Sequence, residues 1–127
     1  MNEAVSLQRK LSLKLVTPAV RAVDRRSAEL RAAGDDLAAA FLAEHRVPLA
    51  QAAADEAARR LASFASYTAQ IPREDRQRRF PPECAEALAF ATMSAVIDAA
   101  VQAARRRATA ASPAGGSPSS RSAGPAG

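Results

Sequence analysis

Alanine dominates this chain and restricts its fold more than any other sequence feature. There are 34 alanines among 127 residues, against 27 residues of the other apolar types (Val, Ile, Leu, Met, Phe, Tyr and Cys) together. Alanine is the best helix former, because its side chain loses no rotamer freedom in a helix. It lets helices approach closely but buries little apolar area. The composition therefore predicts closely packed helices, a monomer of marginal stability, and a need for a partner surface.

Two parts of the chain differ in their ability to fold. Residues 1–107 carry helical periodicity and predict one helical domain, whereas residues 108–127 are Gly, Ser, Pro, Ala and Thr with one charge, Arg121. Without large apolar residues, that last segment cannot offset the entropy of folding, and we expect a disordered tail. No strand alternation and no internal repeat is visible. The fold class we expect is all-α, a small bundle of four or five helices with a disordered C-terminal tail.

Prolines, glycine and acidic residues set the boundaries of the first two helices. A helix is expected over residues 3–33, with a kink or a short break at Pro18 and Thr17 as N-cap. Gly34 is expected to close it in the left-handed conformation. Asp35 and Asp36 then begin a second helix, which Val47-Pro48 is expected to end.

Apolar periodicity predicts two longer helices. One is expected over residues 49–70, and its nearly all-alanine stretch 50–58 indicates a close-contact surface. The other is expected over residues 83–107, with acids in its first turn and arginines in its last. Its core stripe at spacings of three and four is Phe90, Met93, Ile97, Val101 and Ala104, and a second stripe of smaller residues is Cys84, Leu88, Ala91 and Ala95.

Positive charge is concentrated in two segments. The net charge is +5, and arginine supplies sixteen of the eighteen basic residues. Residues 1–34 carry seven basic and three acidic residues, and residues 70–82 carry four and two. Such basic regions suit phosphate-rich partners, which release counterions on binding, but they suit acidic protein surfaces equally well. A solvated face is the third interpretation.

The first helix carries a regular row of cations. Lys10, Lys14, Arg21 and Arg25 are separated by four, seven and four residues, so on a straight helix they fall within an arc of roughly 60°. We call these four residues the basic stripe. It suits a phosphate backbone or an acidic surface, and a bend at Pro18 would weaken it.

The loop expected over residues 70–82 combines charge with one aromatic ring. Single-strand binding sites use arginines on phosphates and rings on bases. A protein interface and a solvated loop remain alternatives, and Glu74 and Asp75 offset two of the charges. The candidate residues of this loop are Arg73, Arg76, Arg78, Arg79 and Phe80.

Catalytic and metal-binding signatures are missing from the sequence. It has one histidine, His45, and one cysteine, Cys84, which excludes an intrachain disulfide and a cysteine cluster. There is no glycine-rich phosphate loop, HExxH or CxxC. No cofactor and no metal are therefore expected. Because neither a signal sequence nor an uncharged apolar window of 18 residues is found, we expect a cytoplasmic protein with no membrane segment.

These features lead to three hypotheses. The first is a non-enzymatic small helical subunit or adapter of a larger assembly, which contacts other protein subunits, identical or different, and binds RNA or DNA through its arginine patches. The second is a purely protein-binding helical module, such as a scaffold, a chaperone or a mobile-element accessory factor. An enzyme with an arginine-lined pocket ranks third. The sequence does not distinguish RNA from DNA.

Overall fold

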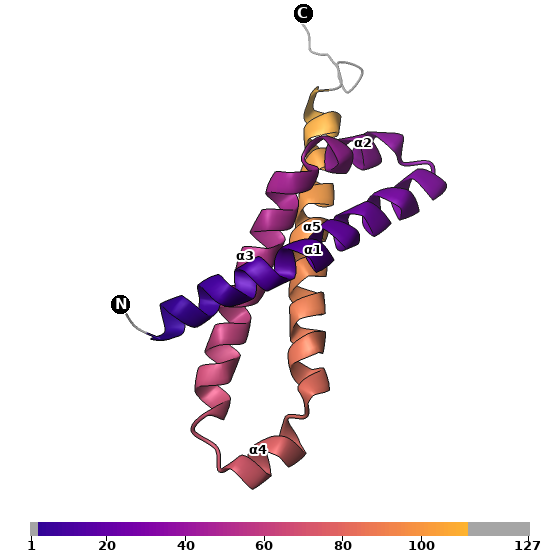
Figure 1. The fold of residues 1–127 in the computed structure, drawn as a ribbon. Helices are drawn as coiled ribbons and strands as arrows, with labels where there is room; N and C mark the ends of the chain where they lie inside the picture. The colour runs from indigo at the N-terminus through magenta and orange to yellow at the C-terminus, as the bar shows by residue number, and fades with distance from the viewer. Residues whose placement is uncertain (1–2, 112–127) are drawn as a thin grey trace, which may run out of the picture.

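The computed structural model describes residues 3–111 and shows five helices over that range, without a strand (Figure 1). The expected all-α bundle is therefore confirmed. The helices are α1 (Glu3–Ala32), α2 (Asp36–Glu44), α3 (Arg46–Thr68), α4 (Arg73–Arg79) and α5 (Pro82–Ala111).

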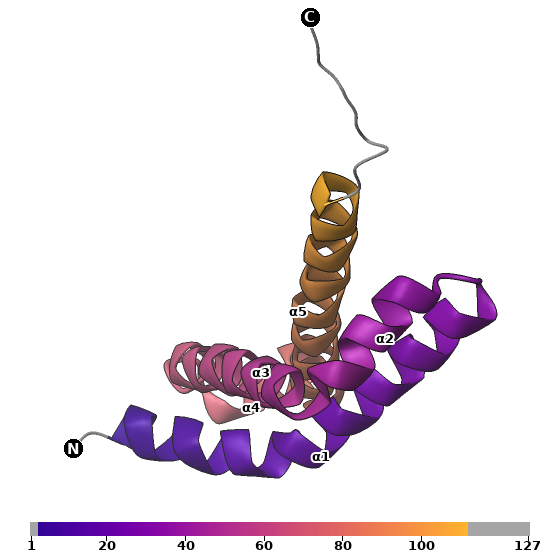
Figure 2. The ribbon, with the colours of Figure 1, turned by 90° about the horizontal axis from the view of Figure 1, so that it is seen from above.

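Helices α3 and α5 form an antiparallel pair that the short helix α4 joins at one end (Figure 1). Helix α1 crosses this pair, and α2 folds back beside the far end of α3 and α5. Seen from above, α1 and α2 lie along one side of the pair (Figure 2). This arrangement leaves one long face of α1 and the α4 end of the hairpin open to solvent.

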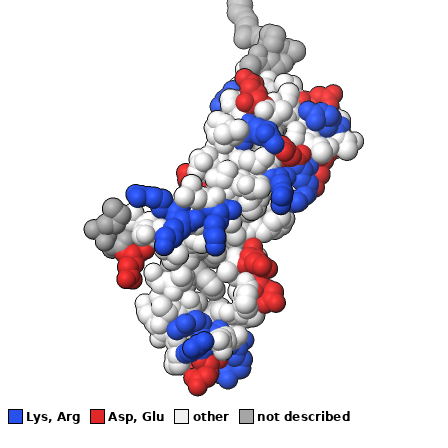
Figure 3. Space-filling view, viewed as in Figure 1, with Lys and Arg blue, Asp and Glu red and all other residues white. Residues whose placement is uncertain are grey.

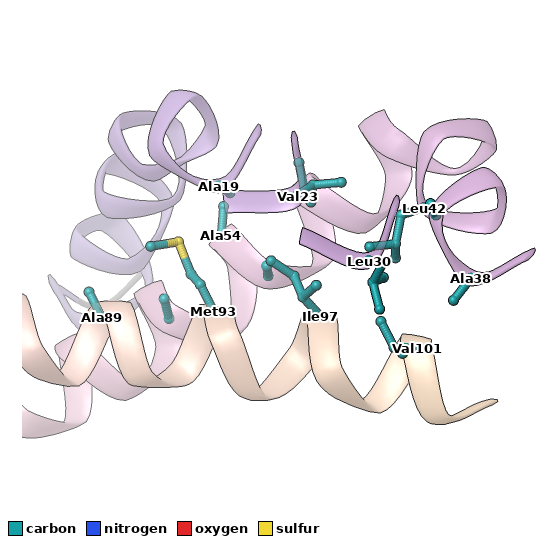
Figure 4. Close-up of a cluster of buried hydrophobic side chains, with 14 residues drawn as sticks. Ala19, Val23, Leu30, Ala38, Leu42, Ala54, Ala89, Met93, Ile97 and Val101 are labelled. Carbon is teal, nitrogen blue, oxygen red and sulfur yellow. The ribbon is translucent and has the colours of Figure 1, made fainter. Parts of the chain in front are cut away.

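Alanines make the close crossing of α1, α3 and α5 possible. Ala54 of α3 is fully buried, and it lies in the core with Ala19 of α1 and Met93 of α5 (Figure 4). The close-contact surface expected at residues 50–58 is confirmed, because the alanines on the inner face of this stretch are at most 1% exposed. They are Ala50, Ala53, Ala54, Ala57 and Ala58. The largest fully buried side chains are Leu42, Ile97, Val23 and Val101.

Helix α1 runs through Pro18 without a break, so the prediction of Thr17 as an N-cap is wrong. Residues on both sides of the proline, Val16 and Val20 among them, pack against the core and hold the helix together. Pro18 still removes one backbone hydrogen bond. Helix α1 bends around its neighbours (Figure 2), and we attribute the bend to this proline, the one proline inside α1.

The turn after α1 confirms the expected boundary residues. Gly34 has a φ of 86°, in the left-handed region. Asp35 is the N-cap of α2, and its carboxylate accepts a hydrogen bond from the Ala38 backbone N–H at 3.2 Å. The expected end of this helix at Val47-Pro48 is wrong. Helix α2 ends at Glu44, and Pro48 lies in the first turn of α3, where its missing N–H leaves no hydrogen bond unmade.

The segment expected to be a loop at residues 70–82 contains the helix α4. Its first turn is acidic, with Glu74 and Asp75, and its last turn is basic, so both ends complement the helix dipole. Helix α5 extends to Ala111, four residues beyond the expected end at 107, because residues 108–111 are alanines and a threonine that continue a helix. The remainder of the expected tail, residues 112–127, lies outside the described residues.

Helix α5 buries most of its expected core stripe. Met93, Ile97 and Val101 are at most 4% exposed. Phe90 is 54% exposed, so its assignment to the core is wrong, and Ala104 is half-buried. Between Pro82 and Ala110, α5 contains an 18-residue window with a mean hydropathy of 1.6, so it is long and apolar enough to cross a membrane by length and composition. A core helix meets the same criterion, and the absence of a membrane segment stays a prediction.

Candidate nucleic-acid interface

The four residues of the basic stripe are exposed on one face of α1. Figure 3 shows lysines and arginines gathered over the N-terminal half of this helix. The opposite face carries the buried side chains Ala19, Val23 and Leu30, so the stripe points away from the core. Fifteen residues separate Lys10 from Arg25, a length of roughly 22 Å along the helix. Helix α1 therefore presents a linear basic surface.

The bend of α1 divides the stripe into two pairs. Lys10 and Lys14 precede Pro18, and Arg21 and Arg25 follow it. Helix α1 curves around its neighbours (Figure 2), so the solvent face that carries the stripe is convex. The bend, which was expected at Pro18, therefore turns the row of four cations into two pairs.

None of the four cations of the stripe has an acidic partner within residues 3–111, whereas several arginines on other surfaces do. On other surfaces, arginines are bound by acids: Arg46 by Asp24, Arg59 and Arg60 by Glu56, Arg78 by Asp75, and Arg105 by Asp35. The positive charge of the stripe is therefore not compensated within the described part of the chain.

These acidic partners have lowered pKa values. Hydrogen bonds from Arg59 and Arg60 hold the pKa of Glu56 below its ordinary value. A hydrogen bond from Arg105, with another from the Ala38 backbone N–H, lowers the pKa of Asp35. These acids stay ionised at neutral pH, so each offsets one positive charge of the arginines that it binds.

A groove between α1 and α5 adjoins the second half of the stripe. It consists of two hollows of about 350 and 180 Å³, and Ala22, Arg25 and Phe90 line both. Arg21 and Pro18 line the smaller one. The structure therefore brings the half-exposed ring of Phe90 next to two unpaired cations of the stripe.

At the other end of this groove, acidic charge exceeds basic charge, because Arg26 lies between two carboxylates. Arg26 donates a hydrogen bond from Nε to Asp98 Oδ1 at 3.1 Å, and its Nη1 lies 3.5 Å from Glu29 Oε1. Both acids line the larger hollow together with Arg26. The positive potential of the groove is therefore concentrated at the end where Arg21 and Arg25 lie.

The α4 residues have partners of their own. Arg76 donates hydrogen bonds from Nε to the Thr68 carbonyl at 2.9 Å and from Nη2 to the Ile71 carbonyl at 3.0 Å. These carbonyls lie at and beyond the C-terminus of α3, so Arg76 caps that helix end. Arg73 is exposed and has no partner among residues 3–111.

The ring of Phe80 also packs within the molecule. Its centroid lies 5.5 Å from that of Phe64 and 6.1 Å from that of Tyr67, both in edge-to-face contacts. The Arg79 guanidinium lies 5.4 Å from the ring centroid. Helix α4 is at one end of the α3–α5 pair, away from the crossing with α1 (Figure 1). The two basic segments therefore form two surfaces, and the structure does not bring them together.

The remaining reactive side chains form no cluster. The His45 ring packs against Phe41, with centroids 4.4 Å apart, and Cys84 is half-buried with a free thiol. Within residues 3–111 no three His, Cys, Asp or Glu side chains are arranged to hold a metal ion.

No protein-family model, curated protein or solved structure matches this chain. The chemistry of its own surfaces is therefore the basis for assigning a function.

Proposed function

We propose that this protein is a non-enzymatic helical subunit or adapter that binds the phosphate backbone of a nucleic acid through the basic stripe of α1. The observation that supports it is that all four cations of the stripe lack an acidic partner within residues 3–111, while several arginines elsewhere bind one. Arg46 and Arg105 each pair with a carboxylate, and Arg59 and Arg60 share that of Glu56, whereas no cation of the stripe pairs with one. Cations without internal partners retain their full attraction for an external polyanion.

The length of the stripe fits a nucleic-acid strand. Measured along the axis of B-form DNA, where each nucleotide of a strand adds a rise of about 3.4 Å, roughly 22 Å corresponds to about six nucleotides. The bend at Pro18 makes this surface convex, which a flexible single strand follows more easily than a stiff duplex does. Each cation that neutralises a phosphate releases counterions, so binding should weaken steeply as salt increases.

The test is the salt dependence of oligonucleotide binding. Two variants each remove one half of the stripe: Lys10→Ala with Lys14→Ala, and Arg21→Ala with Arg25→Ala. For a single strand, log K falls with log salt with a slope of about −0.7 per phosphate contact, so each pair should make the slope less negative by about 1.4. Arg59→Ala with Arg60→Ala is the matched control, because it removes the same charge from arginines already bound to Glu56.

The control pair should leave the slope unchanged. If neither stripe variant changes the slope, or if the wild-type protein binds no oligonucleotide even at low salt, the proposal is wrong. Circular dichroism of each variant verifies that the helices are intact.

A second candidate function is a protein-binding helical module, favoured by a groove between α3 and α5. It has a volume of about 550 Å³, and four alanines, Ala52 on α3 and Ala91, Ala95 and Ala99 on α5, line it together with Leu88, Val96, Thr92 and the ion pair of Glu56 and Arg60. Small residues let a helix of another subunit approach closely. A defined oligomer on sizing in the absence of nucleic acid, disrupted by Ala95→Arg, would support this candidate.

A further inference from the structure

We propose that Phe90, with Arg21 and Arg25, forms a base-stacking site that gives the protein a preference for single-stranded nucleic acid. This inference rests on the proposed backbone binding by α1 and adds to it the recognition of an unpaired base. Phe90 belongs to α5 and the two arginines to α1, so the crossing of the two helices assembles the site.

The exposure of Phe90 is unusual for its helix. Three and seven residues further along the same face, Met93 and Ile97 are 4% and 2% exposed, whereas Phe90 is 54% exposed. A single exposed apolar residue is common on protein surfaces and requires no explanation. The second observation is its position, because the ring lines both hollows of the groove between α1 and α5.

The arginines next to the Phe90 ring are placed to bind the phosphates on either side of a stacked base. Arg25 lines both hollows, Arg21 lines the smaller one, and neither has a carboxylate partner within residues 3–111. In single-strand sites, bases stack on aromatic rings while arginines bind the phosphates between them. All three components of such a site are therefore within one groove.

The charge distribution predicts the path of the strand over the protein surface. Beyond Phe90 on one side, Asp98 and Glu29 hold Arg26 and would repel phosphates. On the other side, the stripe continues past Pro18 to Lys14 and Lys10 without an acidic partner among the residues that the structure describes. A strand whose base stacks on Phe90 is therefore expected to run from this groove along the N-terminal half of α1.

The groove has the size for one base. Its larger hollow, at about 350 Å³, is at the small end of the range of about 300–1,000 Å³ found for small-molecule sites. A duplex keeps its bases stacked on one another, so it offers the ring no free base face. Phe80 is a weaker candidate, because Phe64 and Tyr67 already contact its ring.

A tryptophan at position 90 provides a direct probe, because the natural chain contains none. The full chain carrying Phe90→Trp is titrated at low salt with a 12-nucleotide oligothymidine and with a 12-base-pair duplex. We expect the tryptophan fluorescence to be quenched by the single strand and not by the duplex. Leu37→Trp is the matched control, since Leu37 is 71% exposed on α2, away from the groove, and its fluorescence should not change.

Two further variants measure the contribution of the ring to affinity. Phe90→Ala should weaken binding of the single strand about 5- to 150-fold, the range expected for one stacked base. Phe90→Leu keeps the apolar volume but not the ring, and it should show a similar loss. Neither changes a charge, so the slope of log K against log salt should stay as in the wild type. Thermal unfolding verifies that both variants fold.

The outcomes separate this inference from the proposed function. Unchanged affinity in folded Phe90→Ala, or equal quenching by single strand and duplex, would overturn base stacking and leave backbone binding intact. Absence of any oligonucleotide binding at low salt would overturn both.

Discussion

Arg46, the first residue of α3, donates two parallel hydrogen bonds to the carboxylate of Asp24 of α1. Its Nε donates to Oδ1 at 2.7 Å, and its Nη2 donates to Oδ2 at 2.9 Å. This bidentate geometry is the strong form of an arginine–carboxylate pair. Both side chains are about half exposed, at 47% and 51%, so water weakens the attraction. The pair fixes the start of α3 against α1, and the hydrogen bonds from Arg46 lower the pKa of Asp24.

The first prediction concerns Asp24→Asn and pH. Because the folded-state pKa is lower than the unfolded one, ionised Asp24 stabilises the folded protein above the unfolded pKa of about 3.9. This contribution disappears as the pH falls through the lowered folded-state pKa. Asp24→Asn should therefore lower the thermal midpoint slightly at pH 7, and the difference from wild type should shrink below about pH 4. Thermal unfolding followed by circular dichroism from pH 7 to pH 2 measures both.

Glu44→Gln is the control for this prediction. Glu44 is exposed and has no ion-pair partner among residues 3–111, so removing its charge should not lower the midpoint at pH 7. A midpoint difference for Asp24→Asn that is constant from pH 7 to pH 2 would contradict the role of the ion pair.

The second prediction concerns the crossing of three helices at Ala54. This residue is 0% exposed and has core neighbours from both α1 and α5 (Figure 4), so a larger side chain has no space. Ala54→Leu should lower the free energy of unfolding by about 1–3 kcal/mol, the usual effect of overpacking. The measurement is urea denaturation. Ala52→Leu, two residues away on the exposed side of the same helix, should have a much smaller effect, and equal losses would contradict the prediction.

Local chemistry made several of these elements predictable from the sequence. A glycine after a helix, an aspartate at the next N-cap and a run of alanines each restrict the backbone or the packing within a few residues. Gly34, Asp35 and the buried alanines of residues 50–58 are found as expected. The position of Pro48 was predicted wrongly, because a proline is compatible both with a helix end and with the first turn of a helix.

The groove at Phe90 was not predictable from the sequence. Phe90 follows the same spacing as Met93 and Ile97, and helical periodicity alone assigns all three to the core. Their difference depends on where α1 crosses α5, which is a tertiary contact with no local signal. The helix α4 has an acidic first turn and a basic last turn, but it stands between prolines, which are equally typical of a loop. The functional residues of the basic stripe stay predictions.

The third prediction concerns Gly34, whose φ of 86° other residues rarely adopt. A Cβ added at this position would meet no atom within 4 Å outside the adjoining residues, so crowding plays no part in the effect. Gly34→Ala should lower the free energy of unfolding by about 1–2 kcal/mol through backbone strain alone. Gly34→Asn should lower it less, because asparagine tolerates the left-handed region better. Urea denaturation distinguishes the two, and an equal loss for both variants would contradict this explanation.

The fourth prediction separates structure from binding at α4. Arg76 donates to two carbonyls, of Thr68 and Ile71, at the junction of α3 and α4. Lysine keeps the charge but cannot donate to both carbonyls in the geometry of the planar guanidinium. Arg76→Lys should therefore lower the free energy of unfolding by about 1–2 kcal/mol. Arg73→Ala should not, because Arg73 is exposed and has no partner among residues 3–111. Urea denaturation measures both variants.

Oligonucleotide binding by the same two variants completes the fourth prediction. If Arg76 serves the fold, folded Arg76→Lys should bind a single strand with the wild-type affinity at low salt. A variant of full stability with weakened binding would instead assign Arg76 to the nucleic-acid surface. Arg73→Ala tests whether α4 is a second contact region. A less steep dependence of log K on log salt would extend the interface beyond the stripe. An unchanged dependence would restrict the interface to α1 and the groove at Phe90.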